Sequence, residues 1–375
     1  MERKHPRICL VSIFFNKAFF IPFSNIRRII VEITPESYSI IAADPELLDT
    51  LIFEIEKDDV IFYKNQINPL LRVINYIILN LKISWSVLLR SKDVDSFLFF
   101  METGLPLPMI VAKLRKKRII WLLPSSMRKM MDYHPDLLYL FLIPLQLFSY
   151  NFADKIIVYS PNLIKEWKLQ NYSDKIFIAH EQYININIFS ITTFLKNRPL
   201  LIGYVGRLSE EKGVQNFIRA LPELLNDRKD LSVFIGGDGP LKEAIEINLN
   251  NERLTARVDL PGWISQEDLP KYLNNLRLLV LPSYTEGLPN IMLQAMACGT
   301  LVLATPVGAI TDIIKDKETG FIMENNSPVC IVENITRALE DPNREKIAMN
   351  AKDMVEKEFS FDCTVMQWKR ILNEL

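Results

Sequence analysis

The sequence has few of the residues that build disulfides and metal sites. Its 375 residues include only four cysteines and three histidines. The cysteines (Cys9, Cys298, Cys330 and Cys363) are far apart, form no C-x-x-C pair and have no histidine beside them. This spacing predicts buried thiols in a reducing compartment, and it argues against both a disulfide framework and a zinc site.

The chain also lacks a strong charge imbalance, a cleavable leader and an uncharged membrane span. Its net charge is -1, so nothing in its composition points to nucleic acid as a partner. Arg3 and Lys4 precede the apolar run 8–15, but that run is short and no A-x-A site follows, which predicts a first strand. No uncharged apolar run reaches the roughly 18–20 residues of a membrane span. We therefore expect a cytoplasmic protein.

The residues that are abundant are apolar, at 49% of the chain, and the length suits two domains. Apolar runs of strand length alternate with segments of helical periodicity. In the first half, strands are predicted at 7–15, 37–42, 60–63, 96–100, 118–123, 155–160 and 175–179, and helices at 68–90, 107–115 and 162–167. This alternation predicts an α/β fold with a doubly wound parallel sheet.

The alternation stops and then restarts. Residues 192–198 are polar and irregular and Pro199 follows, so we predict a first domain over 1–191, a linker over 192–199 and a second domain over 200–359. A last helix, 361–375, follows a break at Phe359 and Ser360.

One stretch of the second half, 284–300, joins a buried strand to a short helix and then to another strand. Its turn holds Glu286, Gly287 and Pro289, and the helix ends at Cys298 and Gly299. In open α/β sheets such turns lie at the carboxyl ends of strands, where ligands bind. The first turn of the helix would offer backbone N–H groups to an anion there.

A second turn, 203–213, carries two cations. Arg207 follows the strand end at Gly206, and Lys212 comes five residues later. Two cations at the carboxyl end of a strand suit a diphosphate, because they stabilise the charge that grows as a bond to it breaks.

These motifs resemble those of a known family. Three motifs resemble the signatures of retaining glycosyltransferase family 4 in its archaeal and bacterial members. They are E-G-x-P and A-M-A-x-G within 286–299, and G-R-x-x-x-x-K-G at 206–213. The resemblance implies the GT-B fold, in which two Rossmann-like domains face a cleft and the last helix crosses back to the first domain. It also implies transfer of a sugar from a nucleotide-diphosphate donor, bound mainly by the second domain, to a glycan, lipid or lipid-linked acceptor on the first.

The same resemblance assigns roles to residues. Arg207 and Lys212 would hold the diphosphate, and Glu286 would lie by the donor sugar, so these three are the catalytic candidates. The family's remaining donor contacts fall on Gly206, Gly237, Ile264, Gly287, Leu288, Pro289, Asn290, Ile291 and Gln294. The family usually needs no bound metal, so we expect no metal and no cofactor.

The sequence departs from the family at several positions. Gln294 stands where the family has a second Glu, which would weaken the hold on the donor ribose because an amide lacks the carboxylate's charge. The segment 14–17 has no glycine, and 124–126 has no histidine, where many members carry them. His134 and His180 lie elsewhere and are expected to be structural. Asp93 and Asp95 form a D-x-D pattern, which we read as unrelated to metal binding.

Two alternatives remain open on the sequence: a GT-B nucleotide-sugar epimerase, and a non-catalytic sugar- or membrane-binding protein. The basic run 113–118 is either a solvated helix end, favoured by the helix dipole, or an attraction for anionic lipid headgroups. Together with the apolar stretches 68–90 and 137–153, it raises the prospect of peripheral membrane contact.

Overall fold

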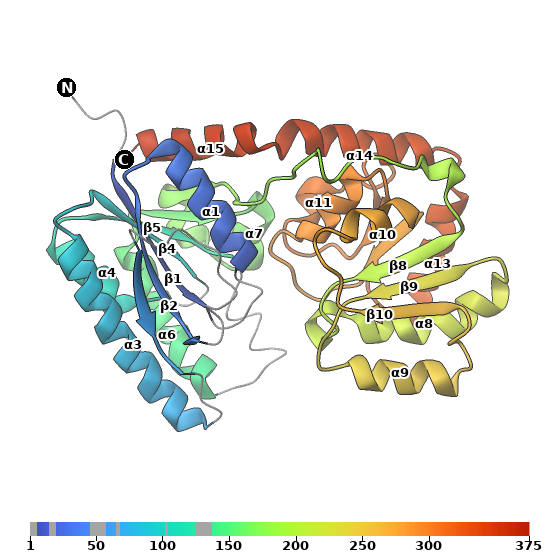
Figure 1. The fold of residues 1–375 in the computed structure, drawn as a ribbon, viewed down its shortest axis with the longest axis horizontal. Helices are drawn as coiled ribbons and strands as arrows, with labels where there is room; N and C mark the ends of the chain where they lie inside the picture. Colours follow the sequence, from blue (N-terminus) through green and yellow to red (C-terminus); the bar gives the residue numbers. More distant parts are fainter. Residues whose placement is uncertain are drawn as a thin grey trace. The chain divides into compact units, whose positions relative to one another are not determined.

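The computed structural model describes residues 6–14, 20–45, 58–64, 68–101, 104–124 and 137–374. The chain divides into two compact units (Figure 1). The first is Met1–Gln182 together with Asp362–Leu375, and the second is Tyr183–Phe361. Each unit contains one parallel sheet with helices, so the predicted fold class of two doubly wound α/β units is confirmed.

The sheet of the first unit has the strand order β3-β2-β1-β4-β5-β6-β7. Every pairing in it is parallel, and in the register Leu10 of β1 lies opposite Ser39 and Leu98. The strands are β1 Ile8–Phe14, β2 Tyr38–Ala43, β3 Asp58–Phe62, β4 Ser96–Phe100, β5 Arg118–Leu122, β6 Lys155–Val158 and β7 Ile176–Ile178. β1 and β4 are buried along their whole length, which explains why they read as continuous apolar runs.

The helical segments of the first unit follow most of the predicted ranges. They are α1 Phe20–Ile33, α3 Pro69–Arg90, α4 Pro106–Leu114, α6 Leu137–Phe152, α7 Pro161–Glu166, the 3₁₀ segment η2 Gln170–Lys175, and α15 Phe361–Asn373. We did not predict α1, although its buried residues Phe23, Ile26, Ile30 and Ile33 recur at helical spacing. α6 continues through Pro144.

The sheet of the second unit has the order β10-β9-β8-β11-β12-β13, again with parallel pairings. Its strands are β8 Leu201–Val205, β9 Ser232–Gly236, β10 Val258–Gly262, β11 Leu278–Leu281, β12 Leu301–Ala304 and β13 Phe321–Ile322. The order reverses between β8 and β11: β8 leads outward through β9 to β10, and β11 leads the other way. That reversal is a topological switch point.

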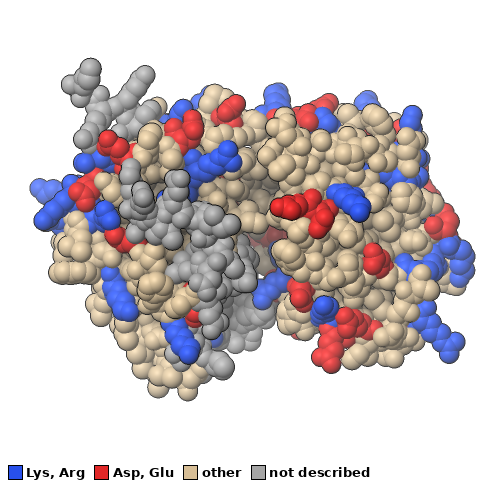
Figure 2. Space-filling model, in the orientation of Figure 1, with Lys and Arg blue, Asp and Glu red and all other residues tan. Residues whose placement is uncertain are grey.

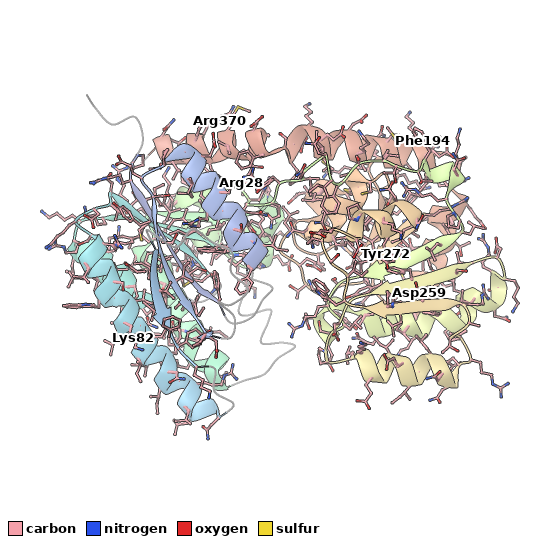
Figure 3. The ribbon with its side chains drawn as sticks, in the orientation of Figure 1. Arg28, Lys82, Phe194, Asp259, Tyr272 and Arg370 are labelled. Atoms are coloured by element: carbon pink, nitrogen blue, oxygen red, sulfur yellow. The ribbon has the colours of Figure 1, made fainter. Side chains whose placement is uncertain are left out.

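The helical segments of the second unit are η3 Leu195–Asn197, η4 Glu210–Lys212, α8 Val214–Asp227, α9 Lys242–Asn251, α10 Leu269–Asn275, α11 Asn290–Ala297, α12 Ile310–Ile313, α13 Pro328–Glu340 and α14 Arg344–Glu358. Phe217 of α8 and Ile335 of α13 share one buried cluster with the strands. On α10, Tyr272 stacks on Phe234 of β9 with ring centroids 4.7 Å apart, and Figure 3 labels Tyr272 there. Packing of this kind fixes the strands whose ends carry the site.

The segment that we predicted as a linker, 192–199, belongs to the second unit instead, and the first unit ends at Gln182 rather than at 191. Arg198 is only 2% exposed. Its guanidinium donates to the carbonyls of Leu276 (2.8 Å) and Cys298 (2.5 Å) and to Thr300 Oγ1 (2.8 Å). These bonds satisfy carbonyls where α10 and α11 end. Arg198 therefore ties the segment to the second unit, although residues 192, 194, 196, 197 and 199 are exposed.

The final helix, α15, belongs to the first unit. The indole N–H of Trp368 donates to the carbonyl of His180 at 2.8 Å, and Lys155 Nζ donates to the carbonyl of Ile371 at 3.0 Å. Trp368 is completely buried. The chain thus leaves the first unit after Gln182 and returns to it at Asp362.

Candidate active site

The candidate residues of the second unit gather at one edge of its sheet. Arg207 and Lys212 follow β8, Gly237 follows β9, Ile264 follows β10 and Glu286 follows β11. Because these strands are parallel, their carboxyl ends share an edge. The loops after β8 and β11 flank the switch point, which is where open α/β sheets bind ligands.

An ion pair joins the two loops at the switch point. Lys212 Nζ lies 2.8 Å from both carboxylate oxygens of Glu286. Glu286 Oε1 also accepts a hydrogen bond from Ser283 Oγ at 2.7 Å. The Glu286 side chain is 8% exposed, whereas that of Lys212 is 29% exposed. The carboxylate is therefore held from inside the unit, and it orients an ammonium group that still reaches solvent.

Two glycines let the backbones come close enough for this pair. Gly213, at φ +66°, follows Lys212, and a Cβ there would collide with the carbonyl of Pro282. Gly308, at φ +59°, has the backbone of Glu286 in the place where its Cβ would be. Any other residue at either position would be strained and would push the Glu286 loop away.

Arg207 lies on the same β8 loop, but its side chain is 55% exposed. Its Nη1 is 4.0 Å from Glu211 Oε1, and that buried carboxylate accepts a hydrogen bond from Ser209 Oγ at 2.6 Å. Tyr204 Oη donates to the Arg207 carbonyl at 2.6 Å, which fixes the backbone of the turn. Burial raises the pKa of Tyr204 well above its usual value, with the Glu286 and Glu211 carboxylates adding to the shift, so this phenol stays a donor.

Backbone hydrogen bonds knit the loops after β8, β9 and β10 together. The N–H of Gly206 donates to the carbonyl of Gly236 at 2.9 Å, and the N–H of Gly237 donates to the carbonyl of Gly262 at 2.7 Å. A Cβ on Gly237, at φ +142°, would meet the Gly206 carbonyl, and one on Gly236 would meet the tip of Ile264. The three predicted residues Gly206, Gly237 and Ile264 are therefore neighbours. Because the glycines have no side chains, their backbone stays uncovered there.

The helix α11 begins directly after the Glu286 turn. Gly287, Leu288 and Pro289 lead into it, with Pro289 as its extended N-cap, and Asn290 and Ile291 form its first turn. Pro289 provides no side-chain cap, so first-turn N–H groups are left without the usual partner. Together with the helix dipole, these N–H groups favour an anion near Lys212 and Arg207.

Gln294 is half-buried, one turn further along α11. Its Nε2 donates to Gln266 Oε1, on the loop after β10, at 3.1 Å. The amide that replaces the family's second Glu is thus already bonded to another amide. That partner was missed in the sequence, because nothing local to Gln266 marks it.

Ser283 and Tyr204 were missed as well. Ser283 lies just before one of the two predicted turns and Tyr204 lies within the other. Ser283 donates to Glu286 and Tyr204 donates to the Arg207 carbonyl, and both hydrogen bonds form only in the folded loops. The available signal was their place in the sequence: Ser283 directly precedes Tyr284, and Tyr204 lies two positions before Gly206.

Among the residues that the structure describes, those predicted in the first unit form no comparable cluster. Asp95 accepts hydrogen bonds from the Arg7 backbone (2.9 Å) and side chain (3.5 Å), which gives this member of the D-x-D pattern a structural role. Burial lowers the pKa of His180 to about 4, so it is a neutral, buried histidine. Residues 15–17, 125–126 and His134 lie outside the described residues. In the described ranges, no group of three or more His, Cys, Asp or Glu side chains is placed to hold a metal ion.

Comparison with known proteins finds a family that the second unit resembles. Residues 188–354 match the model of the family described as "Glycosyl transferases group 1". The chain is 31% identical over 182 residues to alpha-D-kanosaminyltransferase of Streptomyces kanamyceticus, covering 48% of this chain and 47% of that protein. It is 28% identical over 167 residues to the capsular polysaccharide biosynthesis glycosyltransferase CapM of Staphylococcus aureus, covering 44% of each. The chain thus spans about half the length of the curated relatives that it matches.

Comparison of structures extends over both units. HepE of Anabaena, solved in complex with UDP, aligns with a TM-score of 0.78 at 16% identity, covering 98% of this chain and 100% of that chain. A likeness at this identity establishes the fold, which is GT-B. Residues 188–354, which make up most of the second unit, are thus similar to the glycosyl transferases group 1 family, and both units together have the GT-B fold.

Proposed function

We propose that this protein is a retaining glycosyltransferase of family 4 type, which moves a sugar, such as a hexose, from a nucleotide-diphosphate donor to a glycan, lipid or lipid-linked acceptor. The observation that carries the proposal is the pair of Lys212 and Glu286 at the switch point, between the Arg207 turn and the N-terminus of α11. The solved structure of HepE with UDP supports a nucleotide-diphosphate sugar as the donor.

The arrangement suits the departure of a diphosphate. The ammonium group of Lys212 has three N–H donors. Both carboxylate oxygens of Glu286 bind this group, each at 2.8 Å, and they approach it from one side only. The remaining direction is open to solvent and to an anion. Lys212, Arg207 and the first N–H groups of α11 would then share the negative charge that grows on the leaving phosphate.

The bond changes follow from that charge. The bond between the sugar carbon and the diphosphate oxygen breaks, and its electrons go to the diphosphate. The acceptor hydroxyl attacks the same face of the sugar, and its proton passes to the leaving phosphate oxygen. This route needs no strong protein base and no metal, because Lys212 and Arg207 neutralise the charge.

A panel of nucleotide sugars tests the proposal. The purified protein would be incubated with each, and release of nucleotide diphosphate would be measured with Lys212→Ala as the matched blank. Release that needs Lys212 supports transfer or its hydrolytic side reaction, and product analysis with glycan and lipid acceptors identifies the second substrate. An epimerase would interconvert sugars without net loss of nucleotide sugar, and a non-catalytic binding protein would release nothing from any donor; either result would overturn the proposal.

A further inference from the structure

The helix α3 has two apolar faces, and only one of them is covered. One face carries Tyr76, Leu79, Ile83 and Val87, which are between 0% and 5% exposed. The opposite face carries large apolar side chains that are between 42% and 64% exposed: Leu70, Leu71, Ile74, Ile77, Ile78, Leu81, Trp85 and Leu89. At helical spacing these eight form one continuous stripe along the helix.

The helix α6 packs against α3 and carries exposed apolar side chains of its own. Leu140, Phe141, Leu147 and Phe148 of α6 are between 36% and 60% exposed. The two helices thus hold 12 of the 26 large exposed apolar side chains found among the described residues. We call these twelve side chains the apolar surface. Exposed apolar side chains gathered on two packed helices, in contrast to single scattered residues, mark a site of interaction.

The charges carried by the two helices themselves have one sign, and one of them, Arg90, is paired with Asp59 of β3. Neither α3 nor α6 contains an Asp or Glu. Lys82 lies on α3 at the border of the stripe, where Figure 3 labels it, and the surface over α3 in Figure 2 is largely uncharged. At the other end, Arg115 Nε donates to Ser91 Oγ, directly after α3, at 3.0 Å. Residues 69–118 hold nine Lys or Arg against three Asp or Glu, in a chain whose net charge is -1.

Several contacts fix α3 to its own unit. Asn68 Oδ1 caps its first turn by accepting from Leu70 N at 2.9 Å. Arg90 makes two bonds of 2.7 Å to the carboxylate of Asp59 on β3, and Tyr76 Oη donates to the carbonyl of Gly104. The segment Leu70–Arg90 is long and apolar enough to span a membrane by length and composition alone, although it contains Arg72 and Lys82. Its covered face and its anchored ends indicate instead a helix that lies along a surface.

We propose that the apolar surface docks the protein onto an anionic lipid membrane, with α3 lying in the interface. Leucine, isoleucine and phenylalanine side chains enter the acyl boundary, an exposed tryptophan suits the headgroup level, and flanking lysine and arginine attract anionic headgroups. Self-association through the same surface is less suited to these charges. In a two-fold contact both copies would present this same surface, and neither α3 nor α6 carries an Asp or Glu that could pair with Lys82 of the other copy.

Vesicle binding tests this proposal without reference to activity. The full chain would be sedimented with vesicles of phosphatidylglycerol and phosphatidylcholine in equal parts, and with phosphatidylcholine alone. We expect at least tenfold tighter binding to the anionic vesicles, and a loss of at least tenfold in the double variant Ile78→Glu, Trp85→Glu. The matched control is Ile247→Glu, which changes a similarly exposed side chain of α9 in the second unit and is expected to bind within twofold of the parent.

Further measurements separate lipid insertion from adsorption by charge alone and from self-association. Lys82→Glu should weaken binding to anionic vesicles roughly fivefold and leave phosphatidylcholine binding unchanged. In a Trp263→Phe background, brominated acyl chains should quench the fluorescence of Trp85. Thermal unfolding followed by circular dichroism shows that each variant is folded. Absence of vesicle binding, equal binding by the double variant, or a dimer that the double variant splits while vesicles bind neither protein would overturn the proposal.

Discussion

Lys212 Nζ lies 2.8 Å from both carboxylate oxygens of Glu286, a residue 74 positions further along the chain. The two side chains come from turns on either side of the switch point of the second sheet. The family resemblance gave them separate tasks, one at the diphosphate and one at the sugar. The geometry adds that each holds the other in place, so changes at the two positions should be coupled.

The first prediction concerns this pair. Lys212→Ala should lower turnover by roughly two to three orders of magnitude, because it removes a charge that stabilises the leaving group. Glu286→Gln should lower turnover about tenfold, because Lys212 loses the partner that orients it. Turnover of the double variant should stay within about twofold of that of Lys212→Ala. Steady-state kinetics with the best donor measures all three, with the exposed Lys229→Ala as control. Additive losses would show that the two side chains act independently.

Arg207 allows a test that separates catalysis from folding. Its side chain is 55% exposed and lies 4.0 Å from Glu211, so Arg207→Ala should change the free energy of unfolding by less than about 0.5 kcal/mol. Turnover should nevertheless fall by roughly two to three orders of magnitude, since the guanidinium is proposed to hold the diphosphate. Donor turnover equal to that of the parent would remove Arg207 from the site.

Gln294→Glu should tighten donor binding about fivefold. A carboxylate can accept from two ribose hydroxyls with full charge, which adds about 1 kcal/mol. The hydrogen bond from Gln294 to Gln266 Oε1 opposes part of this gain, because a Glu at 294 needs the Gln266 amide to turn and donate. Gln266→Ala should therefore leave the gain in place or enlarge it. Calorimetric titration with the nucleotide diphosphate decides, and weaker binding by Gln294→Glu would mean that this side chain does not meet the ribose.

Chelators should leave activity unchanged, because Arg207 and Lys212 are proposed to neutralise the diphosphate. Activity would be measured after dialysis against EDTA, and again after adding back manganese or magnesium. A lasting loss that manganese restores would contradict metal independence and would direct attention to carboxylates outside the described residues.

The stability of the first unit should depend on Glu181. This side chain is 1% exposed, and it accepts hydrogen bonds from Tyr159 Oη and Gln182 Nε2, each at 2.9 Å. Burial raises its pKa to about 8, from 4.5. The protonated form is thus favoured in the folded protein, so its contribution is complete below pH 4.5 and is lost as the pH rises to about 8.

Thermal unfolding of the parent and of Glu181→Gln at pH 5 and pH 8 measures this effect. The amide cannot ionise, so the variant should gain stability relative to the parent at the higher pH, by on the order of a few kcal/mol. Glu32→Gln, at an exposed position of α1, is the control and should show no such difference. An equal pH dependence of parent and Glu181→Gln would contradict the assignment.

The sequence by itself determined the class of fold and the location of the candidate site. Alternation of strand-length and helix-length segments reproduced nearly all strands, because burial on both faces makes parallel strands read as apolar runs. The turns 206–213 and 284–300 were recognisable because glycines, a proline and charges occur there at fixed local spacing. Such signals depend on backbone conformation over a few residues, which the sequence encodes directly.

Only the tertiary structure decided the contacts between positions that are distant in sequence. It alone shows that Glu286 pairs with Lys212, that Gln294 bonds Gln266, and that Arg198 ties its segment to the second unit. It also shows that one face of α3 is covered and the other is not, which its all-round apolar sequence left undecided. These outcomes depend on which elements pack together, and packing is set by the whole sheet order rather than by any local pattern.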